Sequence, residues 1–420
     1  MKIIEVNNQE FEESVRELPG LTFHQTAGWA KLKAYTGWSN LKLIYQNEQG
    51  KCLAGGLFLL KKLPLFKAYL AYCPRGFLID YAQSELLEHF VKDLKVYLAQ
   101  KKVFELIIDP FWELNHRDSE GQLIADGYDC HYIVDQLKEL GFVHKGYNLY
   151  FENLQPRWLF KLDLRDRTYE EIFNSFRYEA KRRAKKKDQL AIKVRELNES
   201  EIPVFKALMQ QTAERRGFLD RSLGYYQKMY AALHGDKTLR YMVAEMDIQQ
   251  CRRNFEAEVA RQNAKIAKLQ QHAQKNAGRI KEEEVTLHSC ELILEKLTEC
   301  EKRYGQKAPL SVVALLCKGK EAIMLLAGND EEYLQHFNSS NIIVAELIRL
   351  AKEEGYDYYN FYGISGDFDP ANPEYGLYSY KRQYGGQVSE LLGEFTLTLN
   401  KAYKSLYSLM LKAYSLTKRH

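Results

Sequence analysis

The sequence lacks the cysteine pairs that build zinc sites or a disulfide framework. Its seven cysteines are scattered, and none stands in a C-x-x-C pair, which is typical of a protein in a reducing compartment. No apolar stretch reaches the ~18 residues that a membrane-spanning helix needs, and no basic region followed by a long apolar run opens the chain. We therefore expect a cytoplasmic protein that at most touches the inner face of a membrane.

Several catalytic motifs are also absent. There is no G-x-x-x-x-G-K-[ST], no H-E-x-x-H and no G-x-S-x-G, so we expect no metal site, no cofactor and no nucleophile triad. The net charge of +4 over 420 residues is small. Affinity for nucleic acid or an anionic membrane must therefore come from local clusters.

The length of the chain suggests two or three domains. Residues 1–153 alternate short apolar runs, expected as strands at 41–45, 53–60, 69–72 and 104–109, with amphipathic helices such as 84–100. A second unit covers 154–245 and 307–399, with strands at 159–164, 191–196, 239–245, 310–317, 322–327 and 356–362 and helices at 169–187 and 333–354. Residues 400–420 form an expected amphipathic helix that carries Lys401, Lys404, Lys412, Lys418 and Arg419. Mixed strands and helices with long connections predict an α+β fold.

Residues 246–306 differ from the rest of the chain. They contain no proline and only two glycines, and apolar residues recur at the spacing of a heptad seam on either side of a break at 275–278. Two helices joined by a short turn predict an antiparallel coiled-coil hairpin, inserted into the second domain. A strut, a dimerisation device and a clamp for a long ligand are all compatible with such an arm.

The densest basic cluster lies in the expected helix 169–187. Its cations are Arg177, Lys181, Arg182, Arg183, Lys185, Lys186 and Lys187. Cations this close repel one another, and a polyanion would relieve the repulsion while releasing its counterions. The alternative is a solvated helix face without a partner.

Other candidate residues are single anion contacts or carboxylates. Lys33 follows Trp29 by one helical turn, and Arg221 precedes Tyr225 by the same spacing. The pair Tyr380-Lys381 can hold a phosphate or an acyl group. Asp109 ends an expected strand before Pro110, where it either forms a turn or orients an attacking amine.

Taken in order, these motifs resemble the Fem family of non-ribosomal peptidyltransferases over nearly the whole chain. The resemblance rests on Trp29-x-x-x-Lys33, Pro74-Arg75-Gly76, Ile108-Asp109-Pro110, Arg221-x-x-x-Tyr225, the inserted hairpin, Asn360-Phe-Tyr-Gly, Tyr380-Lys381 and Gly393-Glu-Phe395. It implies two acetyltransferase-like (GNAT-like) domains, with the arm in the second. One departure is 324–327, where family members often have a tyrosine and this chain reads Met-Leu-Leu-Ala.

The resemblance also implies an activity and roles for residues. Glycine, alanine or serine would pass from aminoacyl-tRNA to the stem peptide or growing bridge of a peptidoglycan precursor, either lipid II or UDP-MurNAc-pentapeptide. Lys33, Arg221 and Tyr225 would bind the precursor near its diphosphate, and Lys381, Tyr380 and Asp109 would act at the reaction centre. The basic cluster, with Arg177, Lys181, Arg182, Lys185 and Lys186, would bind tRNA, and related Fem proteins are possible partners. The alternatives are an acyl-CoA-type N-acyltransferase and a non-catalytic tRNA-binding protein.

Overall fold

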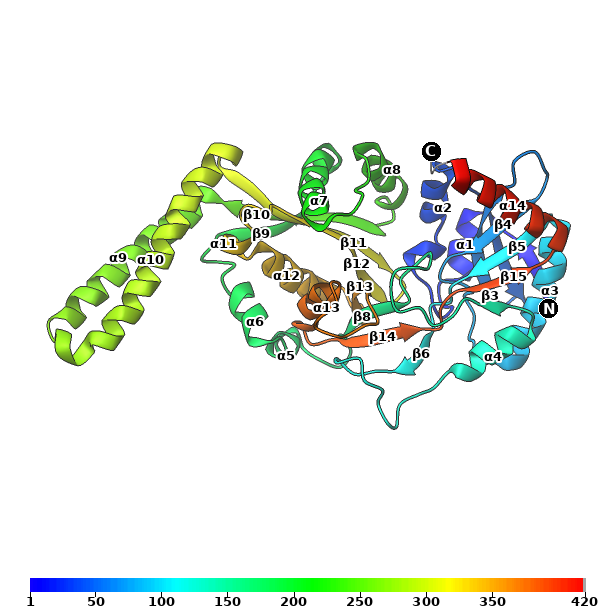
Figure 1. The fold of residues 1–420 in the computed structure, drawn as a ribbon, viewed down its shortest axis with the longest axis horizontal. Coiled ribbons are helices and arrows are strands. Elements are labelled where there is room, and N and C mark those ends of the chain that lie inside the picture. Colours follow the sequence, from blue (N-terminus) through cyan, green and yellow to red (C-terminus); the bar gives the residue numbers. More distant parts are fainter. Residues whose placement is uncertain (418–420) are drawn as a thin grey trace.

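Two mixed β-sheets covered by helices make up the body of the molecule, and a helical arm projects from one end (Figure 1). The computed structural model describes residues 1–417. Within them the first sheet has seven strands in the order β1 (Lys2–Glu5), β2 (Ser39–Gln46), β3 (Cys52–Lys62), β4 (Tyr69–Cys73), β5 (Val103–Ile108), β15 (Phe395–Thr398) and β7 (Val143–His144). The second has eight, in the order β6 (Glu113–His116), β14 (Gln387–Leu391), β8 (Trp158–Asp163), β13 (Tyr358–Ile364), β12 (Glu321–Asn329), β11 (Lys307–Lys318), β10 (Leu239–Asp247) and β9 (Ile192–Glu196). The α+β character expected from the sequence is therefore present.

Two strands cross between the halves of the chain. β6, from the N-terminal part, pairs with β14 at the edge of the second sheet. β15, from the C-terminal part, lies between β5 and β7 in the first sheet, where Phe395 and Leu397 complete a buried core. Sheet membership therefore departs from the expected boundaries 1–153 and 307–399, because β15 fills the first core and β6 pairs along β14 at the edge of the second sheet.

The helices of the first sheet follow from the spacing of apolar residues. α3 (Ser84–Gln100) has the predicted bounds and buries Leu87, Phe90, Val91, Leu94 and Leu98 on one face, beside α4 (His131–Glu139). α14 (Lys401–Thr417) packs in a separate cluster with Leu70 and Phe104. Lys418 and Arg419 of the expected basic helix lie outside the described residues. Within residues 1–417, no helix is long and apolar enough to cross a membrane.

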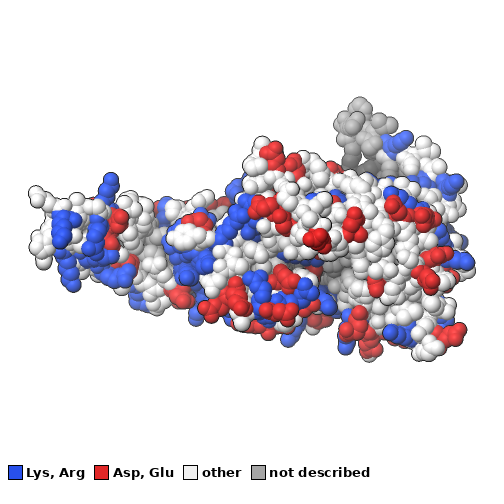
Figure 2. Space-filling view, turned by 90° about the horizontal axis from the view of Figure 1, so that it is seen from below, with Lys and Arg blue, Asp and Glu red and all other residues white. Residues whose placement is uncertain are grey.

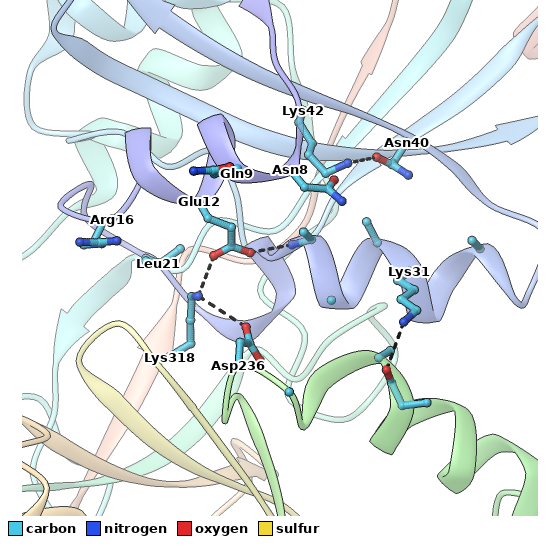
Figure 3. Close-up of a pocket in the computed structure, with 17 residues that line it drawn as sticks. Asn8, Gln9, Glu12, Arg16, Leu21, Lys31, Asn40, Lys42, Asp236 and Lys318 are labelled. Carbon is cyan, nitrogen blue, oxygen red and sulfur yellow. Dashed lines mark hydrogen bonds and ion pairs between the residues drawn. The ribbon is translucent and has the colours of Figure 1, made fainter.

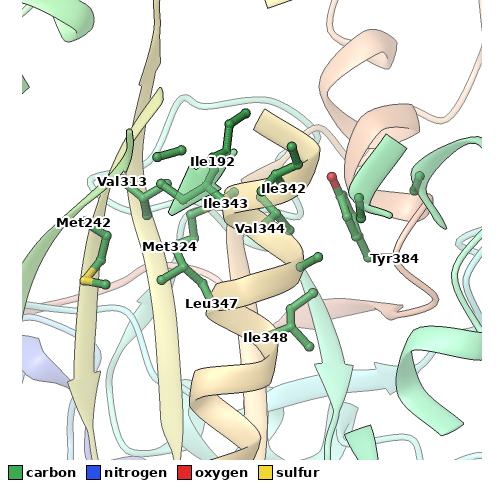
Figure 4. Close-up of a cluster of buried hydrophobic side chains, with 14 of the residues drawn as sticks. Ile192, Met242, Val313, Met324, Ile342, Ile343, Val344, Leu347, Ile348 and Tyr384 are labelled. Atoms are coloured by element: carbon green, nitrogen blue, oxygen red, sulfur yellow. The ribbon is translucent and has the colours of Figure 1, made fainter. Parts of the chain in front are cut away.

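The second sheet is covered on both faces. α12 (Ser339–Glu353) lays Ile343, Leu347 and Ile348 against Met242, Val313 and Met324 (Figure 4). α7 (Ile202–Arg216) and α8 (Leu223–Leu233) pack with the alternate residues Tyr241 and Val243. α1 (Asn8–Ser14), the short helix η1 (Phe23–Gln25) and α2 (Ala27–Ala34) join this second cluster, so it spans both sheets. The 3₁₀ turn η2 (Glu199–Glu201) precedes α7.

Two predicted helices are wrong in detail because each is interrupted. The expected helix 169–187 is two helices, α5 (Tyr169–Asn174) and α6 (Tyr178–Ala184). Arg177 between them is extended, and its backbone N–H donates to the Gln383 carbonyl at 2.8 Å instead of continuing a helix. The expected helix 333–354 is divided into α11 (Leu334–Phe337) and α12 by Asn338, whose φ is +51°. Asparagine is among the residues that adopt this conformation most readily.

The arm consists of α9 (Ile248–Gln270) and α10 (Ala273–Tyr304). They pack on each other along their length, with ion pairs such as Lys265–Glu283 at 2.5 Å and Arg252–Glu301 at 2.7 Å. The turn lies at 271–272, so the predicted break at 275–278 is wrong and falls inside α10. Ile248, Cys251, Phe255, Leu297 and Cys300 at the base are buried in the core of the second sheet, which anchors the arm. The helical hairpin is thus present, and its coiled-coil packing stays a prediction.

Candidate functional site

The packing of α2 against α8 brings three predicted site residues together. Gly28 of α2 permits a close approach, since an added Cβ would stand 2.7 Å from the Ala232 carbonyl of α8. At the end of α2 the Lys33 ammonium lies 4.4 Å from the centre of the Trp29 ring. Burial and the nearby Arg221 lower the pKa of Lys33, so the two cations face one region of space.

Among the side chains described, those of residues 1–412, no carboxylate forms an ion pair with either cation. Arg221 lies over the Tyr225 ring at 5.3 Å, and neither it nor Lys33 forms an ion pair there. Asp220 is held instead by Lys206 at 2.5 Å and by the Tyr226 hydroxyl. The indole N–H of buried Trp29 also has no acceptor among the described residues. Two cations and free donors of this kind suit an anionic ligand such as a diphosphate.

His24 is a buried histidine whose ring lies near both Lys33 and Arg75. Its ring is 2% exposed, and burial, Arg75 and Lys33 together hold the pKa of His24 well below its usual range. The imidazole is therefore neutral near pH 7, and both positive charges act on it. Gln25 beside it has a structural task, because its side chain accepts from the Leu57 N–H at 2.6 Å and also donates to the Pro74 carbonyl.

Asp109 lies at the end of β5, buried among polar groups. It accepts from the Arg75 N–H at 2.7 Å and from the Tyr72 hydroxyl at 3.2 Å, and the Arg75 guanidinium is 3.8 Å away. Burial outweighs these contacts and raises the pKa of Asp109 to about 6. A carboxyl with such a pKa can take up and release a proton near neutral pH.

Tyr362 faces the same cluster from the second sheet. Its φ of +66° is rare for an aromatic residue, and its N–H donates to the Asn360 side chain at 2.8 Å. The Tyr362 hydroxyl donates to Gln155 at 2.6 Å, and its pKa is raised by burial and by Asp109 while Arg75 opposes the rise. Residues from both sheets therefore meet around Asp109.

The second sheet opens beside Tyr362. The parallel strands β12 and β13 pair only from Glu321–Tyr358 to Ile323–Asn360, although β12 runs on to Asn329 and β13 to Ile364. A break in register on the other side of β13, between Asn360 and Gly363, accompanies the opening. Beyond Ile323 and Asn360, the facing backbone groups of β12 and β13 are therefore not paired with each other.

Lys381 approaches β13 from the opposite face. It lies in α13 (Tyr375–Arg382), and its ammonium donates to the Gly363 carbonyl at 2.6 Å. The side chain is 4% exposed, and desolvation lowers its pKa to about 7. Lys381 and Tyr362 therefore flank one short segment of β13 from two sides. A lysine with this pKa can serve as a charged or as a neutral group near pH 7.

Tyr380 does not share the direction of Lys381. Its hydroxyl donates to the Ser340 carbonyl at 3.1 Å and lies 3.2 Å from the Tyr384 hydroxyl. Tyr384 in turn accepts from Asn341 at 2.9 Å. These contacts hold α13 against α12, so Tyr380 has a structural role. Its predicted catalytic role stays a prediction.

The basic cluster sits on and after α6, near the base of the arm. Several of its cations are engaged, with Arg177–Glu120 at 3.2 Å, Arg182–Glu179 at 2.8 Å and Lys187–Glu346 at 3.0 Å, while Lys181 donates to the Asn174 carbonyl at 2.8 Å. Lys185 is exposed, and burial followed by Arg182 lowers the pKa of Lys186. Lysine and arginine gather along the arm and where it joins the body (Figure 2).

A cavity of about 420 Å³ separates α6 from α13. Its lining residues are Arg177, Tyr178, Glu179, Arg183, Ser379 and Gln383. Tyr178 is 75% exposed, which is unusual for a ring of this size. The cavity thus combines arginines with an accessible aromatic face, and it reaches the helix that carries Lys381.

A larger cavity, of about 800 Å³, lies between the two halves of the chain and contains none of the predicted site residues. Figure 3 shows Glu12 of α1 joined to Lys318 at 2.6 Å, with Asp236 on the other side of Lys318 at 3.9 Å. Lys31 donates to the Ala231 carbonyl at 3.2 Å. These bonds fix α1 and α2 against the second sheet, and so hold Lys33 beside Arg221.

Sequence reasoning passed over the residues that connect the site. Arg75 and Tyr362 belong to the motifs Pro74-Arg75-Gly76 and Asn360-Phe-Tyr-Gly, and their position beside a glycine was the only sign in the sequence of a special role. Tyr72, Gln155 and His24 gave no usable signal, because only folding brings them to Asp109 and Lys33. Within residues 1–417, no group of three or more His, Cys, Asp or Glu side chains could hold a metal ion.

Several known proteins are similar to this chain in sequence, and one solved structure is similar to it in fold. Residues 6–412 match the model of the FemAB family. A lipid II:glycine glycyltransferase from Staphylococcus epidermidis is 29% identical over 409 residues, covering 96% of this chain and 94% of that one. An aminoacyltransferase FemA from Staphylococcus aureus is 28% identical over 426 residues, covering 98% and 99%. The crystal structure of FemX superposes with a TM-score of 0.78 at 27% identity, covering 97% of this chain and 99% of that one.

Proposed function

This chain belongs to the FemAB family and is an aminoacyltransferase that forms peptide bonds, and we propose that it moves glycine from aminoacyl-tRNA to lipid II or its partly built bridge. The observation that carries the proposal is the anion site made by Lys33, Arg221 and Tyr225. Relatives named for lipid II and glycine favour that acceptor and that amino acid. Alanine, serine and a nucleotide-linked acceptor are the other outcomes of the test.

The anion site suits the diphosphate of the precursor. Lys33 and Arg221 come from different halves of the chain, and no carboxylate pairs with them within residues 1–417. Each charge-assisted hydrogen bond to a phosphate is worth about 1.5–3 kcal/mol. The sugar and peptide extend from the diphosphate, and in this proposal they run past His24 and Arg75 toward Asp109.

The chemistry needs positioning more than activation, since an aminoacyl ester is already reactive. The acceptor amine attacks the ester carbonyl carbon, the new C–N bond forms, and the bond to the tRNA ribose oxygen breaks. The amine proton passes to that leaving oxygen, directly or through the neighbouring ribose hydroxyl. We assign orientation of the amine to Asp109 and stabilisation of the oxyanion to Lys381.

The opening between β12 and β13 supports an encounter at Tyr362. Precursor groups bind on the side of α2 and α8, while Lys381 and the basic cluster face the other side of the second sheet. Two substrates that approach from opposite faces meet where the strands separate. Lys381 and Asp109 then act on different atoms of one transition state.

We assign tRNA to the basic cluster and the arm. The assigned cations are Arg177, Lys181, Arg182, Lys185 and Lys186. Tyr178 adds a surface on which an unpaired base can stack, at about 1–3 kcal/mol per base. The charge on the arm extends this surface away from the body (Figure 2). Related Fem proteins, which could pass on a partly built bridge, are proposed as partners.

One assay tests the function. Charged tRNAs carrying glycine, alanine or serine are combined with lipid II and with UDP-MurNAc-pentapeptide, and products are read by mass spectrometry. We expect a single added glycine on lipid II, and Arg221→Met to raise KM for lipid II at least tenfold. The matched control is Arg216→Met, an exposed arginine at the end of α7. Transfer from acetyl-CoA, or tRNA binding with no transfer to any acceptor, would overturn the proposal.

A further inference from the structure

The turn between β3 and β4 carries an exposed apolar tip. Leu65 is 96% exposed with φ of +67°, and Phe66 is 38% exposed. The buried residues Leu63 and Ala68 on either side hold the turn in place. Leu65 and Phe66 together place neighbouring apolar surface at the end of this fixed turn.

Positive charge surrounds this tip. Lys62 and Lys67 flank it and are exposed, and residues 59–68 contain no Asp or Glu. α14 lies beside the turn, with the Phe66 and Tyr403 rings 6.0 Å apart, and residues 400–420 contain no acidic residue either. Apolar tips within basic surroundings are typical of segments that rest in the headgroup layer of an anionic bilayer.

The orientation of α14 leaves further apolar side chains outside. Tyr403, Leu406, Tyr407 and Met410 pack inward on the cluster with Phe104, and Lys404 is paired with Glu105. On the flanks, Leu409 is 64% and Leu411 is 50% exposed. We call Lys62, Leu65, Phe66, Lys67, Lys401, Leu409 and Leu411 the basic-apolar patch.

Next to the patch in sequence, Lys61 is bonded to the segment that follows α2, the helix that carries Lys33. Lys61 of β3 donates to the Thr36 and Gly37 carbonyls at 3.1 and 3.3 Å, directly after the helix that ends near Lys33. α2, α8 and α14 lie along one edge of the molecule (Figure 1). A second exposed apolar tip, with Leu219 at 95% and Phe218 at 45%, stands just before Arg221. Each half of the chain therefore contributes one exposed apolar tip.

We propose that the basic-apolar patch and the 218–219 tip dock this enzyme on an anionic phospholipid bilayer, with the Lys33–Arg221 site facing the headgroups. The proposal rests on the proposed function for its purpose, because the diphosphate of a lipid-linked acceptor lies at headgroup level. In this orientation the basic cluster faces away from the bilayer, since it lies on the other side of the second sheet. The tRNA can then approach from the aqueous side.

Vesicle sedimentation tests the docking. The full chain is mixed with phosphatidylcholine vesicles, with or without phosphatidylglycerol. We expect binding only with phosphatidylglycerol, weakening as salt rises. The double variant Leu65→Ser/Phe66→Ser should bind at least tenfold more weakly. Leu123→Ser is the matched control, because Leu123 is 62% exposed in a loop after β6.

A second measurement separates docking from catalysis. Transfer by the double variant should fall at least fivefold on lipid II in vesicles, yet stay unchanged on lipid II dispersed in detergent. No binding of the wild type to anionic vesicles, equal binding of the double variant, or equal losses on both forms of lipid II would overturn the docking. Normal vesicle binding by a protein that transfers nothing would instead overturn the proposed function and leave the docking intact.

Discussion

Replacing Lys381 with methionine should abolish transfer and yet stabilise the fold. Desolvation lowers the pKa of Lys381 from 10.5 to about 7. The folded state therefore binds fewer protons than the unfolded state between these values, and its stability rises with pH across this window. The difference between the folded and unfolded pKa of Lys381 lowers the free energy of unfolding by about 4 kcal/mol at pH 7 and by about 2 kcal/mol at pH 9.

Methionine removes this cost but leaves the Gly363 carbonyl without its 2.6 Å donor. An unpaired buried carbonyl costs about 1–3 kcal/mol. We therefore expect the free energy of unfolding of Lys381→Met to exceed that of the wild type by about 2 kcal/mol at pH 7. At pH 9 the two proteins should be nearly equally stable. Lys381→Arg is the opposite control, because arginine stays charged and should destabilise the protein at both values.

Urea unfolding at pH 7 and pH 9, together with transfer from charged tRNA, measures both effects. A Met variant that is less stable than the wild type at pH 7, or a stability difference that does not change with pH, would refute the claim that desolvation of Lys381 lowers its pKa and destabilises the fold. Unchanged turnover in a folded Met variant would remove Lys381 from the reaction centre.

Three further predictions use other parts of the site. Gly28→Ala should raise KM for the precursor about tenfold without changing tRNA affinity, because the added Cβ would stand 2.7 Å from the Ala232 carbonyl and push α2 away from α8. Steady-state kinetics measure this effect. Gly224→Ala is the control, because an added Cβ there would have nothing within 4 Å. Asp109 has a pKa of about 6, so kcat should rise with pH through that value, and a pH profile of Asp109→Asn should lack this limb; an unchanged profile contradicts a role for Asp109. Removing residues 264–284, beyond the buried base of the arm, should leave stability and precursor binding intact and weaken tRNA binding at least tenfold by filter binding; unaltered tRNA affinity would make the arm a strut.

Local patterns in the sequence predicted the elements whose stability is local. The 84–100 helix was right at both ends because its apolar spacing alone sets the buried face. The arm was predicted because apolar residues recur at heptad spacing within 61 residues that contain no proline, although its turn was misplaced by a few residues. Helix 169–187 failed because the Arg177 N–H bonds to Gln383, a partner far along the chain.

Residue types and their order along the chain determined the family and named Lys33, Asp109, Arg221, Tyr225 and Lys381 as candidates. Only the tertiary structure decided which of them meet. Lys33 and Arg221 lie near each other because Gly28 lets α2 and α8, from different halves of the chain, pack closely, while Tyr380 points away from Lys381. The exchange of β6 and β15, the opening beside Tyr362 and the pKa values of Asp109 and Lys381 depend on burial by distant segments. The pattern and spacing of residues report the conformational preference of a short segment. Desolvation and contacts between distant residues arise only when the whole chain has folded.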